Sequence, residues 1–323
     1  EYFVNGLKVR DESGMMWINY GLVFKGIGAG VYYDGASYAD EYTGSNGRQF
    51  SANFDGNGAT VRIAVNNTYN NHPAGLFGYI YRTNANIMPT VRDLTVTGYA
   101  RGRQHSGAVA GYVLGNTCRF DNVTVTDASI TGKNSGGVVG EIGPLASNLL
   151  NKTASVQVNA AVEDNIPTYE NVKVIGLTAI HATSYAGGIV GKSRGSSMYM
   201  RQVTVGDNSY GGTDNYRRYK EYVDGEYTGK DLFYSFERES FASSVSIDGA
   251  IAGGAVGAQL YSYPNYSQTD FWEIDYSGFN GISINGSTNA GGMIGQAQMY
   301  ENAMVMALYE NDVNRPLRKS HEN

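Results

Sequence analysis

The chain has few residues whose type and spacing suit acid–base chemistry. Asp93, Asp121 and Asp127 could supply the two carboxyl groups that a polysaccharide-cleaving β-helix enzyme needs. Asp93 and Asp121, however, flank strand-like segments, where a turn residue is expected in any case. None of the four histidines lies in H-E-x-x-H, and there is no G-x-S-x-G. We therefore expect a protein that is not an enzyme, with no catalytic residue, no cofactor and no metal site.

Tyrosine is the residue type that stands out as a means of binding. The chain has 26 tyrosines, and several gather in two segments rich in polar residues. Tyrosine gives a large contact area at a small cost in conformational entropy, which suits a glycan or a protein surface. The same residues could instead fold back and cover the scaffold. The candidate ligand-binding residues are Tyr216, Tyr219, Tyr222, Tyr227, Tyr234, Tyr261 and Tyr263.

A glycine motif recurs along the chain and indicates what must position these tyrosines. Its copies read AGLFG at 74–78, SGAVAG at 106–111, SGGVVG at 135–140, AGGIVG at 186–191, AGGAVG at 252–257 and AGGMIG at 290–295. A segment of alternating apolar and polar residues precedes each copy. From Leu94 to Gly111 and from Val123 to Gly140 the spacing is 17 residues, and from Gly111 to Val123 it is 12. A unit of about 29 residues therefore repeats, which is typical of solenoids and propellers.

The pattern within the unit predicts the fold. Alternation with period two indicates strands, and glycine allows sharp corners between them. We expect an all-β protein, a parallel β-helix of about six coils with three short strands each, capped at both ends. Its core would be built by stacking one pair of apolar residues from each coil. The expected pairs are Val61/Ile63, Leu94/Val96, Val123/Val125, Val172/Val174, Val203/Val205 and Trp272/Ile274.

The glycine motif also resembles a known family. G-L-F-G at 75–78 and its relatives GVVG, GIVG, GAVG and GMIG are similar to the GLUG-motif repeat of bacterial surface proteins, and FDGNGATV at 54–61 resembles the segment that opens such arrays. The resemblance covers roughly residues 50–295. It implies a secreted or surface-anchored, adhesin-like protein. Only one copy is a literal G-L-x-G, and SGAVAG carries an extra residue.

The breaks in the repeat suggest a division of the chain. Residues 1–48 would form an N-terminal cap, residues 49–295 the repeat domain, and residues 296–323 a C-terminal cap or tail with mixed helical character. The spacing is too long at two places, which predicts insertions near 141–165 and 208–243. Binding residues commonly lie in such insertions on a regular scaffold.

Composition and charge narrow the partners. The net charge is -6 and the sequence pI is about 5.3, which argues against nucleic acid because a phosphate-binding face needs a basic excess. No apolar run is long enough to span a bilayer. We expect an extracellular, adhesin-like protein that binds glycan or protein, with two alternatives. One is a structural subunit that self-associates through its end caps into a filament or array, and the other is the polysaccharide-degrading enzyme.

Overall fold

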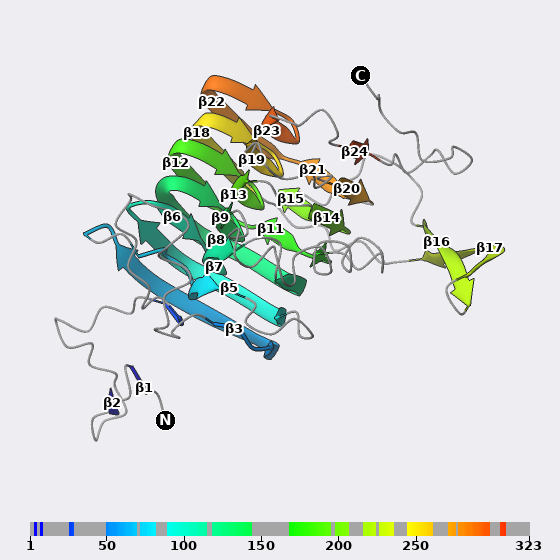
Figure 1. The fold of residues 1–323 in the computed structure, drawn as a ribbon, viewed down its shortest axis with the longest axis horizontal. Coiled ribbons are helices and arrows are strands. Elements are labelled where there is room, and N and C mark those ends of the chain that lie inside the picture. Colours follow the sequence, from blue (N-terminus) through cyan, green and yellow to red (C-terminus); the bar gives the residue numbers. More distant parts are fainter. Residues whose placement is uncertain are drawn as a thin grey trace, which may run out of the picture.

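All regular structure in the described part of the protein is β-strand. The computed structural model describes residues 3–4, 7–8, 26–28, 50–69, 72–81, 89–114, 118–143, 168–194, 198–206, 216–223, 226–235, 244–260, 271–275, 277–297 and 304–307. No helix occurs in these ranges, and none that could cross a membrane is therefore found there. Strands from successive repeats stack in parallel along one direction, in order of sequence (Figure 1). The expectation of an all-β protein is confirmed.

Most strands belong to one large sheet of 14 strands. Its strands are β3 (Phe54–Asn67), β5 (Thr90–Gly102), β6 (His105–Gly107), β8 (Arg119–Gly136), β10 (Tyr169–Glu170), β11 (Lys173–Ile175), β12 (Ala179–Gly187), β14 (Met198–Arg201), β15 (Thr204–Gly206), β18 (Val245–Gly253), β20 (Phe271–Asp275), β21 (Gly278–Asn280), β22 (Ile282–Gly291) and β24 (Met304–Ala307).

A smaller sheet of six strands runs beside the large one. Its strands are β4 (Phe77–Ile80), β7 (Ala110–Leu114), β9 (Val139–Gly143), β13 (Val190–Arg194), β19 (Val256–Leu260) and β23 (Ile294–Ala297). Two antiparallel pairs complete the described strands, β1 (Phe3–Val4) with β2 (Leu7–Lys8), and β16 (Tyr216–Val223) with β17 (Glu226–Ser235).

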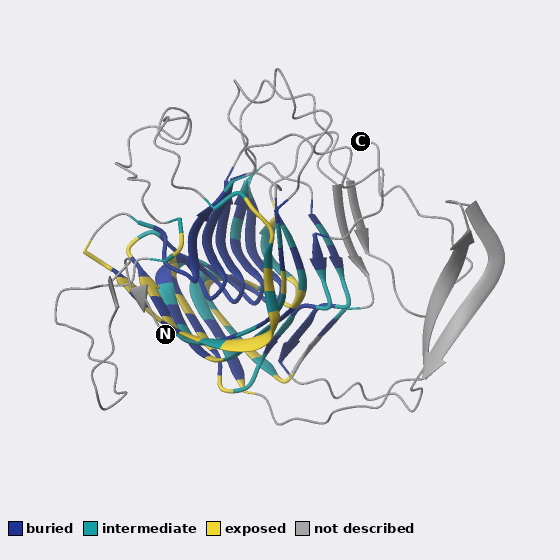
Figure 2. Ribbon diagram, turned by 90° about the horizontal axis from the view of Figure 1, so that it is seen from below, coloured by how far each residue is buried: buried dark blue, intermediate teal, exposed yellow. Residues whose placement is uncertain are grey.

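Residues one repeat apart pair in parallel register. Leu94 pairs with Val123, and Val125 pairs with both Val96 and Val174. Their side chains are buried in one continuous apolar cluster, together with those of the small sheet. Figure 2 shows this buried band following the stacked strands. Because each repeat buries its apolar face against the next, the arrangement is consistent with a β-helix-like fold.

The strands that come from one repeat form one layer of the stack, which we call a rung. Backbone turns with positive φ set the corners of each rung. The first corner falls at a row of polar residues, Asp93, Asn122, Asn171 and Gln202, and the second at Gly98, Asp127, Gly176 and Gly206. The first corner interrupts the pairing, so the chain from Tyr169 to Arg194 forms four strands, β10 to β13, instead of the three expected for a unit.

Two of the six expected core pairs were aligned wrongly. Val61 pairs with Val96, and Ala59 with Leu94, so the first pair is two residues out of register. The reason is a longer path into the first glycine motif: the chain takes seven residues from Asn67 to Ala74, but only four between their register partners Gly102 and Ser106. One of these three extra residues is offset within the motif, where AGLFG is one residue shorter than SGAVAG, which leaves a shift of two. An alignment of Val61 with Leu94 that rests on their equal distance from the glycine motif is therefore wrong by two residues.

The sixth pair lies on a different part of the large sheet. Trp272 pairs with Met198 in β14, whereas the partner of Val205 is Phe279. A five-residue segment with alternating character looks the same in sequence wherever it lies in the rung, so Trp272 and Ile274 were assigned to the wrong strand. The helical expectation for the C-terminal segment is also wrong at 304–307, because β24 continues the sheet beside β20.

Candidate functional site

Two rows of side chains face each other across the third corner of the rungs, where the glycine motif links the large sheet to the small one. His105, Asn134 and Tyr185 are register neighbours on β6, β8 and β12. Tyr112, Glu141 and Lys192 are register neighbours on β7, β9 and β13. Each member of the first row lies seven residues before its partner in the second.

The three facing pairs are in contact. The rings of His105 and Tyr112 meet edge to face, with centroids 5.3 Å apart. Asn134 Nδ2 donates to Glu141 Oε2 over 2.6 Å. Lys192 Nζ lies 5.3 Å from the ring centroid of Tyr185. The glycine corner therefore brings a polar pair, a cation and aromatic rings together in three successive rungs.

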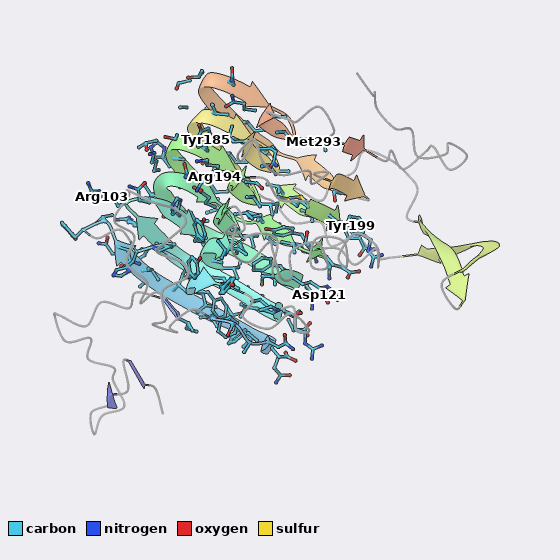
Figure 3. All side chains as sticks on the ribbon, viewed as in Figure 1. Arg103, Asp121, Tyr185, Arg194, Tyr199 and Met293 are labelled. Carbon is cyan, nitrogen blue, oxygen red and sulfur yellow. The ribbon has the colours of Figure 1, made fainter. Side chains whose placement is uncertain are left out.

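Glu141 is the centre of this region. Its side chain is fully buried, and its Oε2 lies 3.0 Å from His105 Nδ1 and 3.8 Å from Lys192 Nζ. Its Oε1 lies 2.7 Å from an Nη of Arg194. We call His105, Asn134, Glu141, Lys192 and Arg194 the Glu141 cluster. Figure 3 labels Tyr185 and Arg194, which lie among the middle rungs.

The electrostatics of the cluster keep the carboxylate ionised. Burial alone would raise the pKa of Glu141, but the charges of His105, Arg194 and Lys192 hold it well below its usual range. Burial lowers the pKa of Lys192, and the carboxylate of Glu141 opposes that shift only in part. The cluster thus combines an ionised carboxylate with an amine that loses its proton more readily than a surface lysine does.

A second charged group is more exposed. Glu170 binds Arg119 through one carboxylate oxygen and Arg201 through the other, and Arg119 also lies 3.1 Å from Asp121. Asp121, Glu170 and Arg201 occupy the same register on β8, β10 and β14, and Arg119 lies two residues before Asp121 on β8. All four side chains are partly buried, between the fully enclosed Glu141 cluster and an ion pair on the open surface.

The three aspartates that could have served an enzyme have other partners. Asp93 has positive φ and its Oδ1 accepts a hydrogen bond from Asn122 Nδ2, so the turn interpretation is confirmed for it. Asp121 comes one residue before the equivalent turn, which Asn122 occupies, so the turn interpretation is wrong for Asp121. Asp127 also has positive φ, and its Oδ1 accepts from Leu177 N.

The predicted ligand-binding tyrosines fall into two groups along the chain, which follow different strands. Tyr216, Tyr219 and Tyr222 lie on β16, and Tyr227 and Tyr234 on β17; these strands follow the second corner. Tyr261 and Tyr263 come directly after β19, at the carboxyl end of the small sheet, and lie outside the described residues. The structure gives the backbone pairing of the first group only.

The sequence analysis does not identify the Glu141 cluster, because its members come from three different repeats and form no continuous motif. The signal that could have found it is the seven-residue spacing from the residue before the glycine motif to the residue after it. Aligned by repeat, this spacing sets Asn134 against Glu141 and Tyr185 against Lys192. Within the described ranges, no three His, Cys, Asp or Glu side chains gather so as to hold a metal ion.

Comparison of this chain with family models, with curated proteins and with solved structures gave no match. The function has to be argued from the molecule itself.

Proposed function

We propose that the protein is a non-enzymatic, extracellular, adhesin-like protein. In this proposal the parallel strands form a β-helix of about six coils of the GLUG-repeat type. The β-helix is a rigid scaffold, and a tyrosine-rich insertion binds a glycan or a protein surface. The observation that carries the proposal is the way in which this insertion joins the scaffold.

The insertion leaves and re-enters the stack without disturbing it. In the preceding rung, the second corner passes from Val174 through Gly176 and Leu177 to β12. In the next rung, Val205 pairs with Val174, and Ser244 N donates to Gly176 O. This hydrogen bond sets Ser244 beside Leu177. The chain thus takes 39 residues from Val205 to Ser244, where the preceding rung takes 3 from Val174 to Leu177, so 36 residues, 208–243, are extra. A segment that the scaffold does not need for its own pairing is a natural place for function.

The insertion contains its own antiparallel pair. In the register of β16 and β17, Tyr222 is directly opposite Tyr227, and Arg217 is opposite Tyr234. Tyrosine and arginine are the residue types that dominate the energetics of binding surfaces. Five of the seven candidate tyrosines thus belong to one two-stranded unit, which makes that unit the preferred binding element over Tyr261 and Tyr263.

The proposal is tested by binding to a glycan array and to extracellular-matrix proteins. The variant with Tyr216, Tyr219 and Tyr222 replaced by Ala should lose binding at least tenfold. Tyr69→Ala is the matched control, because Tyr69 is 93% exposed on the scaffold itself. If only a Tyr261→Ala/Tyr263→Ala variant lost binding, the binding site would have to be assigned to the segment that follows β19 instead. Equal binding by all variants would contradict the proposal.

One observation favours the second candidate, a self-associating subunit. In β22, Ile282 and Ile284 are only partly buried, whereas their register partners Val245 and Ile247 in β18 are 1% and 0% exposed. An incompletely covered strand edge can pair with another chain. Sedimentation at increasing concentration separates the two functions, because a binding protein stays at one size while a filament subunit grows.

A further inference from the structure

The Glu141 cluster gathers three groups of complementary chemistry around one carboxylate oxygen. They are a primary amine on Lys192, a primary amide on Asn134 and the carboxylate of Glu141. The carboxylate oxygen Oε2 lies 2.6 Å from the nitrogen of the amide and 3.8 Å from the amine. Asn134 is 2% exposed, Glu141 is fully buried, and the Lys192 side chain is 13% exposed.

We propose that Lys192 and Asn134 become joined by an intramolecular amide bond, with Glu141 carrying the proton. The Lys192 Nζ attacks Asn134 Cγ, so a C–N bond forms while the bond from Cγ to Nδ2 breaks. One proton moves from Nζ to Nδ2 by way of Glu141 Oε2, and Nδ2 leaves as ammonia. Nothing is oxidised or reduced, and no co-reactant is needed.

The position of Oε2 is the main geometric argument. A proton shuttle must contact both the nitrogen that gives up the proton and the nitrogen that receives it. Oε2 already accepts a hydrogen bond from the nitrogen that would leave and lies near the nitrogen that would attack. A base must start unprotonated. Glu141 does so, because its carboxylate is also in contact with His105 and Arg194.

The surroundings favour the amine as a nucleophile. A lysine amine attacks only when it is unprotonated, and desolvation favours that form. Lys192 is enclosed beside the Tyr185 ring, and its pKa is lowered by burial. The close fit also limits the water that would compete for the Asn134 carbon. Lys133, next to Asn134 in sequence, is exposed and has none of these features.

The bond would join two rungs of the stack. Asn134 lies on β8, and Lys192 lies on β13 of the following rung, because β9 pairs with β13. The link would cross the third corner and close the chain between residues 134 and 192 into a covalent loop. A cross-link of this kind restricts the unfolded chain, as a disulfide does. The inference does not depend on what the tyrosine-rich insertion binds.

Intact mass spectrometry of the purified full-length chain tests the proposal. The expected mass is the sequence mass less one molecule of ammonia, and protease digestion should yield one branched peptide that contains Asn134 and Lys192. Lys192→Arg keeps the cation but removes the nucleophile, and Glu141→Gln removes the shuttle. Both variants should show the full mass of their sequence, whereas Lys133→Arg should still be lighter than its sequence by one molecule of ammonia.

Two outcomes would overturn the proposal. The first is wild-type protein at its full sequence mass, with separate peptides for Asn134 and Lys192. The second is a loss of ammonia that persists in Lys192→Arg, since Asn134 would then have cyclised on its own backbone next to Ser135. The peptide map of the wild-type chain decides the question even if a variant fails to fold.

Discussion

A single ionised carboxylate, that of Glu141, is the shared partner of the most deeply buried charged groups in the described part of the fold. Glu141 has contacts with His105, Asn134, Lys192 and Arg194, and all of them would lose their shared acceptor if the charge were removed. Removing one member of a buried ion pair is far more costly than removing an exposed pair, because the remaining charge stays desolvated.

Glu141→Gln should therefore lower the free energy of unfolding by about 3 kcal/mol or more. Asp55→Asn is the control, because Asp55 pairs with Arg92 on the surface, and this substitution should have a much smaller effect on the free energy of unfolding. Urea titration measures both. Lys192→Arg preserves the cation and separates the effect of charge from that of a cross-link. Equal effects of the two carboxylate variants would contradict a central role for Glu141.

The lowered pKa of Glu141 also predicts how stability depends on pH. An unfolded chain binds a proton at Glu near pH ~4.3, whereas the folded protein binds it only in stronger acid. The stabilisation is present above that value and is lost as the pH falls towards the pKa of the folded state. The difference in stability between wild type and Glu141→Gln should thus shrink steadily as the pH falls below about 5. A difference that is constant in acid would show that Glu141 does not titrate in this way.

The row of polar residues at the first corner stabilises the turn in two ways. Asn122 has a φ of 51°, and its side chain donates to Asp93 and accepts from Asn171. Asn122→Gly keeps the backbone conformation and loses the hydrogen bonds, whereas Asn122→Ala loses both. We expect the Ala variant to be less stable than the Gly variant by about 1 kcal/mol. Thermal unfolding compares them, and an Ala variant as stable as the Gly variant would exclude backbone strain at this corner.

At the scale of elements, the glycine motif predicted which segments pair, but not every register. Leu94 and Val123 are placed correctly because both lie 17 residues before the last glycine of their motif, and Val203 because it follows Gly191 by 12 residues, as Val123 follows Gly111. Val172 is placed correctly by its alternating pattern alone, since an insertion precedes it. The first repeat failed because its extra loop residues lie between the strand and the glycines. Trp272 failed because short alternating segments recur on several strands of one rung. Side-chain contacts across a corner, such as Asn134 with Glu141, depend on how tightly the corner closes, which spacing alone does not reveal.

The tightness of the third corner comes from glycines stacked on glycines. A Cβ atom on Gly188 would lie 2.0 Å from the carbonyl oxygen of Gly254 and 2.8 Å from a methyl group of Val205. Gly292, at the last described rung, has no atom within 4 Å of its Cβ position. Gly188→Ala should cost about 2–3 kcal/mol, while Gly292→Ala should change stability by less than about 0.5 kcal/mol. Equal stability of the two variants in urea would mean that the corners can widen freely.

At the scale of the whole molecule, each rung depends mainly on its neighbours. Strand pairing within the stack joins successive repeats, and the apolar cluster is continuous through them. Stability in such an array is approximately a sum of rung terms and interface terms. A segment outside this pairing should contribute little to it, however long it is, since loop-closure entropy grows slowly with length.

The insertion provides a test of this independence. Removing residues 208–243 would join Asp207 directly to Ser244, which reproduces the short path that Gly176 and Leu177 take in the preceding rung. The shortened protein should keep its β circular dichroism and its unfolding midpoint within a few degrees, because no pairing of β15 or β18 is lost. It should also lose ligand binding to the same extent as the triple tyrosine variant. Unfolding of the shortened protein would instead show that the insertion covers the stack, and its tyrosines would then be part of the core and not of a binding surface.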